Sequence, residues 1–184
     1  MNYKLKSSEL DRPSISNYKI SQKNSIYVIL DNIRSAQNVG SFFRTCDAFN
    51  VEKIFLCGIT STPPNKEILK TALGSTESVD WEYFEKTEDC IALLKTSNCI
   101  INSVEQTQNS VKLNDYFEDY SKKIALVFGN EVDGVAQTVI DLSDNTIEIP
   151  QFGTKHSLNV SVAAGITLWD ITSKMLNDKK VKIK

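Results

Sequence analysis

The sequence predicts an α/β fold in which a mainly parallel sheet is flanked by helices. Two observations carry this prediction: apolar, β-branched segments recur along the chain, and stretches with helical periodicity lie between them. Strands that alternate with helices form parallel sheets covered on both faces, because each crossover helix packs back on the sheet. With 184 residues, of which 41% are hydrophobic, the chain is long enough for one domain with a real core.

Six strands are predicted, after an opening segment that has no sustained period. That segment, residues 1–25, is polar and contains Pro13 and several serines, so we expect an arm or a short helical extension there. The strands are predicted from runs that have the length and the β-branched or aromatic composition of strands. In chain order these runs are 26–30, 54–57, 79–84, 99–104, 124–128 and 146–149.

Helices are predicted between and after these strands. The first has an amphipathic face, with apolar residues mostly three or four positions apart: Val39, Phe42, Phe43, Cys46 and Phe49. Three shorter helices, at 65–73, 87–95 and 135–142, each begin near a polar capping residue or a Pro or Gly break. The last, 157–176, opens with small and apolar residues, as a helix packed on both sides does.

Cysteine and histidine usage argues against a metal site. The four cysteines, Cys46, Cys57, Cys90 and Cys99, form no CxxC pair, and His156 is the single histidine. The chain opens without the pattern of a signal peptide, and its apolar runs are about five residues long where a membrane span needs ~20. We therefore expect a cytoplasmic protein with reduced thiols, no metal and no membrane partner.

The ends of the chain are basic and its body is acidic. The net charge is −2, with residues 1–25 contributing +3 and residues 174–184 contributing +4, which leaves −9 for the body. Basic arms could contact RNA, whose binding depends on Lys and Arg neutralising phosphates. The other interpretation, which charge alone favours, is that lysine-rich termini are solvated ends.

The loop after the first predicted strand lacks the GxGxxG pattern of dinucleotide-binding folds, which argues against nicotinamide, flavin and the common methyltransferase fold. It contains Asn38 and Gly40 at the start of a helix, with Arg44 one turn beyond Gly40. A guanidinium beside free helix N-terminal N–H groups suits a phosphate. A surface arginine after a capped helix start is the other interpretation.

Two later loops place polar groups at the same edge of the sheet. The fifth strand runs into Gly129, Asn130 and Glu131, and Glu131 could accept hydrogen bonds from a ligand, hold an arginine, or cap the helix near residue 135. The loop after the sixth strand holds Gly153 and then hydroxyl and amide side chains at a helix start. This uncharged polar set suits an adenine edge better than a phosphate, and His156 is interpreted as a loop residue.

Three motifs together resemble a known family. NxGxxxR at 38–44, FGNEVDG at 128–134 and IPxxGxxxSLNVSVAAGI at 149–166 closely resemble the motifs of the SpoU/TrmH family of RNA 2′-O-ribose methyltransferases, in the SPOUT superfamily. The resemblance implies a C-terminal trefoil knot, a homodimer and S-adenosylmethionine as cofactor. The resemblance covers roughly residues 26–173. With the charge pattern, it leads us to expect a SPOUT methyltransferase domain at 26–176, between a basic N-terminal arm or extension at 1–25 and a basic C-terminal tail at 177–184.

The resemblance also assigns residues. The catalytic set it implies is Arg44, held by Asn38, with Glu131, Ser157 and Asn159. Cofactor contacts, mostly through backbone atoms that bind adenine, fall on Ser103, Val104, Gly129, Asn130, Ile149, Gln151, Leu158 and Asn159.

The implied reaction is attack of a ribose 2′-hydroxyl on the activated methyl group, so the enzyme mainly aligns the two and helps to remove a proton. Arg44 acts either as the base or as an anchor for the adjacent phosphate. A guanidinium almost always stays charged, which argues against the role of base.

With only about 25 residues before the first strand, the short build favours tRNA slightly over rRNA. An idle RNA-binding or assembly protein is the alternative, and an unrelated nucleotide-binding protein would need a phosphate loop that is absent.

Overall fold

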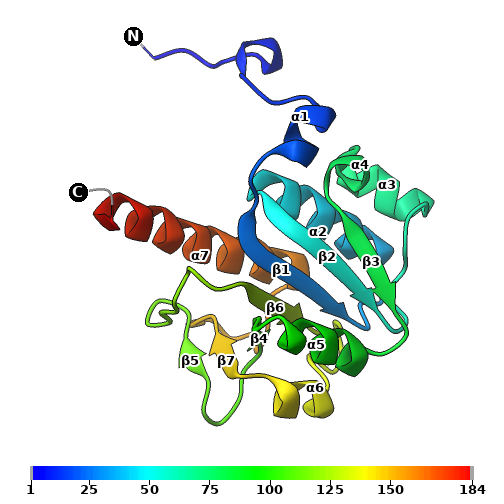
Figure 1. Cartoon of the computed structure of the whole chain (residues 1–184). Coiled ribbons are helices and arrows are strands. Elements are labelled where there is room, and N and C mark those ends of the chain that lie inside the picture. Colours follow the sequence, from blue (N-terminus) through cyan, green and yellow to red (C-terminus); the bar gives the residue numbers. More distant parts are fainter. Residues whose placement is uncertain (1, 183–184) are drawn as a thin grey trace.

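A seven-stranded parallel sheet forms the centre of the structure, a computed structural model that describes residues 2–182 (Figure 1). The strands are ordered β3-β2-β1-β6-β4-β7-β5, and all neighbours run parallel. They are β1 (Asn24–Asp31), β2 (Val51–Cys57), β3 (Trp81–Phe84), β4 (Ile100–Val104), β5 (Val111–Lys112), β6 (Ile124–Phe128) and β7 (Asn145–Glu148). The predicted α/β fold with its mainly parallel sheet is confirmed.

All six predicted strands are present, and two short elements were not predicted. β3 begins two residues later than expected, because the chain just before it forms the short helix α4 (Ser75–Ser78), whose C-cap is Val79. β5 has only two residues, too few for a hydrophobic pattern, and pairs with β7 at the edge of the sheet.

The helices occur in the predicted order, but the helix expected at 135–142 begins two residues later, at Gln137, and the last helix differs at both ends. They are α1 (Ile15–Ile20), α2 (Ala36–Ala48), α3 (Lys66–Ala72), α5 (Thr87–Thr96), α6 (Gln137–Leu142) and α7 (Val160–Lys182), besides a 3₁₀ turn at Ser7–Glu9. The last helix begins at Val160, not at residue 157, because the Asn159 carboxamide oxygen accepts hydrogen bonds from the N–H groups of Ser161 and Val162 and so caps it. It continues to Lys182 through most of the predicted basic tail, whose residues 183 and 184 lie outside the described part.

Helices cover both faces of the sheet, and β1 contributes to both cores. Ile26, Val28 and Leu30 pack on one face against α2, α3 and α7, whereas Ile29 belongs to the core of the opposite face beneath α5 and α6. Successive side chains of a strand point to opposite faces, so a strand in the middle of the sheet is apolar throughout. This explains why residues 26–30, in β1, form a continuous apolar run in the sequence.

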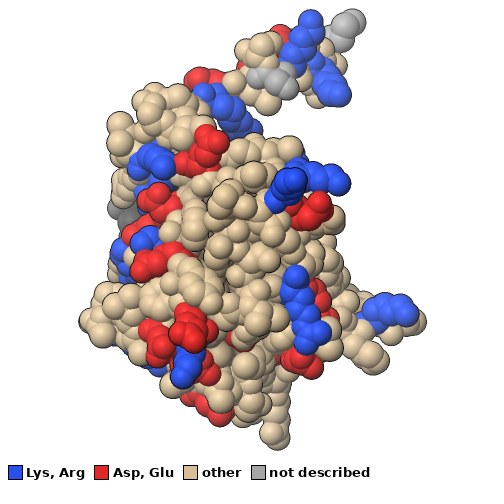
Figure 2. All heavy atoms as spheres, turned by 90° about the vertical axis from the view of Figure 1, so that its right-hand side faces the viewer, with Lys and Arg blue, Asp and Glu red and all other residues tan. Residues whose placement is uncertain are grey.

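The N-terminal segment is anchored at α1 and projects from the body before it (Figure 1). Tyr18 is buried, and its hydroxyl donates a hydrogen bond to the Asp47 carbonyl at 3.1 Å. Burial raises the pKa of this phenol, and Asp47 adds to the effect. Figure 2 shows Lys and Arg side chains on the projecting arm and a mixture of acidic and basic side chains over the rest of that face.

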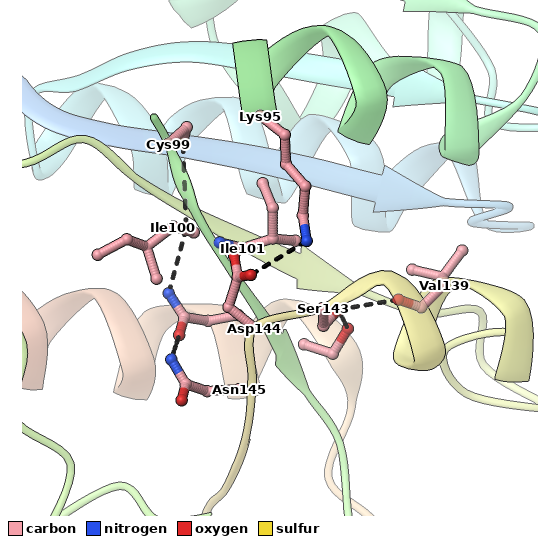
Figure 3. Close-up of polar contacts among 10 residues, drawn as sticks. Lys95, Cys99, Ile100, Ile101, Val139, Ser143, Asp144 and Asn145 are labelled. Atoms are coloured by element: carbon pink, nitrogen blue, oxygen red, sulfur yellow. Dashed lines mark hydrogen bonds and ion pairs between the residues drawn. The ribbon is translucent and has the colours of Figure 1, made fainter. Parts of the chain in front are cut away.

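Asp144 joins three elements at the start of β7 (Figure 3). One carboxylate oxygen accepts a hydrogen bond from the Ile101 N–H of β4 at 2.8 Å, and the other lies 3.0 Å from the Lys95 ammonium of α5. Next to it, the Asn145 amide donates to the Asn102 carboxamide oxygen at 3.0 Å. These bonds fix the register of β7 beside β4.

Candidate active site at the carboxyl edge of the sheet

A pocket of about 610 Å³ opens where β4, β6 and β7 end. Ligands of open α/β sheets bind at this edge, outside the carboxyl ends of the strands. The lining residues come from the last residues of these strands, from the three loops that follow them and from the first turn of α7: Val104, Glu105, Gln106, Phe128, Gly129, Asn130, Glu131, Val132, Asp133, Gly134, Ile147, Glu148, Ile149, Gln151, His156, Ser157, Leu158, Asn159, Val160 and Ala163. Its volume suits a ligand of nucleoside size.

Glu131 caps the N-terminus of α2. Its carboxylate accepts hydrogen bonds from the N–H groups of Arg34 and Ser35, at 3.0 and 3.1 Å, and from the Asn38 amide at 2.7 Å. A carboxylate is favoured at this end of a helix because unpaired N–H groups and the positive end of the helix dipole meet there. Of the roles considered for Glu131, the structure therefore shows a cap, but on α2 and not on the helix near residue 135.

The pKa of Glu131 is lowered by this arrangement. Partial burial opposes ionisation and is the largest single effect, but the hydrogen bonds from the Asn38 side chain and from the backbone of Arg34, of Glu131 itself and of Ser35 together outweigh it. The side chain is therefore an ionised acceptor at neutral pH, unsuited to give or take a proton there.

Asn38 links all three motifs. Its amide donates to Glu131, and its carboxamide oxygen accepts a hydrogen bond from the Asn159 amide at 3.2 Å. Asn159 in turn caps α7, so the loop after β1, the loop after β6 and the start of α7 share one network.

Arg44 stands apart from this network. It is an exposed residue of α2, does not line the pocket, and makes no ion pair within residues 2–182. The Asn38 amide that was expected to hold Arg44 is engaged by Glu131 and Asn159. The two residues share a helix but no hydrogen bond in the described chain.

Two of the motif glycines serve packing. A Cβ at Gly40 would overlap the Thr71 hydroxyl and the Ile68 carbonyl of α3, so Gly40 allows the two helices to approach closely. A Cβ at Gly129 would overlap the backbone of Gly134, with which Asn130 forms a bridge. Gly129 thus closes the tight turn while its backbone lines the pocket.

Most of the residues assigned to the cofactor lie together. Seven line the pocket: Val104, Gly129, Asn130, Ile149, Gln151, Leu158 and Asn159. Ser103 does not, because it is fully buried in β4 and its hydroxyl is hydrogen-bonded to the Ser143 hydroxyl at 2.7 Å. Of the proposed catalytic residues, Glu131, Ser157 and Asn159 line the pocket and Asn38 is bonded to two of them.

Three residues near the pocket were missed by sequence reasoning. The Glu105 carboxylate accepts a hydrogen bond from the Val135 N–H at 3.0 Å, and the Gln106 amide donates to the His156 carbonyl at 2.7 Å. Both come directly after β4, and this position at a strand end was the signal that could have found them. The Arg34 guanidinium lies 3.5 Å from the Asp133 carboxylate, a contact between loops that no sequence pattern marks.

The cysteines lie in the apolar cores on the two faces of the sheet, and His156 lines the pocket. All four cysteines are free and buried, and burial raises the pKa of Cys99 to about 12. Among residues 2–182, no group of three or more His, Cys, Asp and Glu side chains is arranged to hold a metal ion, and no helix is long and apolar enough to cross a membrane.

The chain resembles RNA-modifying methyltransferases in sequence and in structure. Residues 25–169 match the model of the SpoU rRNA Methylase family. It is 32% identical to a tRNA (guanosine(18)-2′-O)-methyltransferase of Aquifex aeolicus over 81% of this chain and 69% of that protein. A 23S rRNA (guanosine-2′-O-)-methyltransferase of Neisseria meningitidis is 30% identical over 85% of this chain and 62% of its own length.

Solved structures of RNA-modifying methyltransferases are similar to this chain as well. The A. aeolicus TrmH/SpoU tRNA modifying enzyme superposes with a TM-score of 0.77 at 28% identity, over 88% of this chain and 80% of that one. An rRNA methyltransferase from Sinorhizobium meliloti with AdoMet bound gives a TM-score of 0.76 at 30% identity, over 84% of this chain and 58% of that one. The chain thus spans between 58 and 80% of the length of these relatives and solved chains.

Proposed function

The chain belongs to the SpoU rRNA methylase family, and on that premise we propose that it transfers a methyl group from S-adenosylmethionine to a ribose 2′-hydroxyl of tRNA or rRNA. The observation that carries the proposal is the hydrogen-bonded junction of Asn38, Glu131 and Asn159 at the rim of the pocket. It joins one residue from each of the three motifs, and it gives the pocket a rigid polar wall.

The pocket fits S-adenosylmethionine. Apolar side chains such as Ile149 and Leu158 lie beside backbone groups of the surrounding loops, as an adenine ring requires, and the carboxylates of Glu105 and Glu148 suit hydroxyl groups and positive charge. When bound, the cofactor supplies a methyl group already activated on a positively charged sulfur. The chain's own task is therefore to hold and orient.

The residues around the entrance suit the reacting ribose. Ser157 and Asn159 offer a hydroxyl and an amide on the loop that leads into α7, and both line the pocket. Asn159 is fixed by its bonds to Asn38 and to the first N–H groups of α7, so it presents its amide without a cost in side-chain ordering. These residues align the hydroxyl, while Arg44 on α2 binds the neighbouring phosphate.

Purified protein and labelled S-adenosylmethionine test the function. We expect calorimetry to show cofactor binding, and we expect label to enter RNA prepared from cells that lack the protein, at a 2′-hydroxyl that can be mapped to one nucleotide. Asn38→Ala should lower the rate, whereas Asn65→Ala, which removes the cap of α3 elsewhere in the fold, is the matched control. Cofactor binding with no transfer to any RNA pool would overturn the proposal and leave an idle RNA-binding protein, which no feature of the site favours.

The proposal extends to a homodimer and a knotted chain. A row of exposed apolar side chains on α7, formed by Val162, Ile166 and Trp169, supports a second copy as partner, because apolar surface of this kind is stabilised by burial. The return of residues 149–159 to the pocket built by the loops after β4 and β6 supports a trefoil knot around the cofactor. The methyltransferase domain would be 26–176, acting in the cytoplasm.

A further inference from the structure

An aromatic side chain on the loop that borders the pocket has almost no protein neighbour. Phe152 is 98% exposed, the largest exposed fraction among the large apolar residues of the described chain. It lies between Gln151 and His156, which both line the pocket. A single exposed apolar residue is common on protein surfaces, so exposure alone does not indicate a function. The position of Phe152 beside the pocket is what indicates one.

The loop that carries Phe152 is fixed at both ends. It leaves β7 after Glu148, and the Gln106 amide holds the His156 carbonyl at 2.7 Å. Between these points Gly153 has open space around it, with nothing within 4 Å of a built Cβ. The ring is therefore presented to solvent by an anchored loop, and no nearby part of the described chain covers it.

Two further exposed residues belong to the loops that border the pocket. Val132, from the loop after β6, lines the pocket and is 68% exposed. Lys155, three residues after Phe152, is an exposed cation. An aromatic platform beside a cation is the pattern by which proteins bind unpaired nucleotides: the ring stacks on a base, and the cation neutralises a phosphate.

We propose that Phe152 is a stacking platform for a base of the RNA substrate next to the ribose that enters the pocket, with Lys155 beside the adjoining phosphate. The inference rests on the proposed function and narrows its substrate class. Bases inside a helix have no free face, so the platform requires an unpaired nucleotide in a loop, a bulge or a single strand.

Four variants test this role. Phe152→Ala and Phe152→Leu remove the ring, Phe152→Trp keeps an aromatic face, and Phe117→Ala removes a ring that is 75% exposed and does not line the pocket. Methyl transfer to RNA from cells lacking the protein is measured as KM and kcat, together with the Kd for S-adenosylmethionine. The Ala and Leu variants should raise the KM for RNA roughly tenfold, the size of one stacking contact, while kcat and the cofactor Kd stay at wild-type values. The Trp and Phe117 variants should match the wild type.

Other outcomes distinguish a failure of this inference from a failure of the proposed function. An active wild type with an unchanged KM in Phe152→Ala overturns the inference alone, and so does full activity of Phe152→Leu, because an aliphatic side chain cannot stack in this way. A change of oligomeric state in Phe152→Ala, seen by light scattering, overturns it in favour of a protein contact. A wild type that methylates no RNA overturns the proposed function and the inference with it. Annealing a complementary strand over the mapped site should abolish transfer.

Discussion

Arg44 is proposed as a phosphate anchor, and a substitution tests that role. The side chain is exposed on α2, outside the pocket lining, and an arginine binds phosphate through a planar fork of donors. We therefore expect Arg44→Lys to weaken RNA binding and to leave the pH profile of transfer unchanged, because a lysine binds phosphate as a point charge without the planar fork. Recovery of most of the rate with a pH optimum that tracks the lysine would instead identify this position as the base.

Gly40 and Gly165 offer a matched pair of helical glycines. A Cβ at Gly40 meets α3, whereas a Cβ at Gly165 in α7 meets nothing within 4 Å. We expect Gly40→Ala to lower the free energy of unfolding by about 1–3 kcal/mol through overpacking. Gly165→Ala should raise the free energy of unfolding of the single chain by roughly 0.5–1 kcal/mol, because alanine restricts the unfolded chain. Urea unfolding of the two variants measures both, and equal effects would show that the approach of α2 to α3 is not tight.

The sequence located the site better than it assigned the side chains. Glu131 and Asn159 were found because polar residues at strand ends and helix starts are conspicuous. Their partners were not, since the bond from Asn38 to Glu131 spans 93 residues and the bond from Asn159 to Asn38 spans 121. A local sequence pattern cannot predict pairings between residues that lie so far apart in the chain. Ser103 shows the same limit, because only the packed structure reveals that its hydroxyl faces Ser143.

At the level of single elements, α7 carries the exposed apolar row that the proposed dimer would bury. Trp169 is 66% exposed and packs edge-on against Phe49, with ring centroids 6.3 Å apart. We expect Trp169→Glu to convert a dimer to a monomer in light scattering, because a charge in an apolar interface must be desolvated. Leu69→Glu places the same charge on α3, where Leu69 is 44% exposed, and should leave the assembly unchanged. A wild-type monomer would contradict the dimer outright.

Two substitutions of Asp144 can distinguish the stability that its hydrogen bond to the backbone contributes from the stability that its ion pair contributes. Asp144→Asn keeps an acceptor for the Ile101 N–H and loses only a half-exposed ion pair with Lys95, so we expect a cost of at most about 1 kcal/mol. Asp144→Ala removes the acceptor as well, and should cost about 1–3 kcal/mol because the N–H group loses its partner. Denaturant titration at one salt concentration compares the two variants. Equal losses would assign the stabilisation to the ion pair.

Elements with a strong period could be predicted, and elements decided by local hydrogen bonds could not. The strands of the central sheet are buried on both faces and give uninterrupted apolar runs. The start of α7 was placed three residues early, because the small and apolar residues there fit a helix equally well and only the Asn159 cap ends the ambiguity. α4 has a single turn, which is shorter than any periodicity can detect.

For the whole molecule, the separation of charge predicts how RNA binding responds to salt. The arm before α1 carries Lys4, Lys6 and Arg12, while the buried Tyr18 anchors α1 itself to the body. Deleting residues 2–13 should therefore preserve the fold and cofactor binding and weaken RNA binding. If all three cations touch phosphates, the slope of log K against log salt should fall by about 2, at ~0.7 per contact.

The control for this deletion changes charge away from the arm. Lys66→Gln with Lys70→Gln removes two cations from α3 and should leave the slope near its wild-type value. RNA affinity that is unaffected by the deletion would mean that the arm is only a solvated end.

The junction of Asn38, Glu131 and Asn159 also sets the order in which the protein can become active during synthesis. Its members are distributed over 121 positions of the chain, so a growing polypeptide that already contains β1 and α2 cannot yet close the pocket. At translation speeds of about 5–20 residues per second, the N-terminal half of the sheet waits several seconds for Asn159 to emerge from the ribosome. On the proposed function, methyl transfer therefore requires the chain at least as far as the start of α7, and a product that ends before Asn159 cannot form the junction.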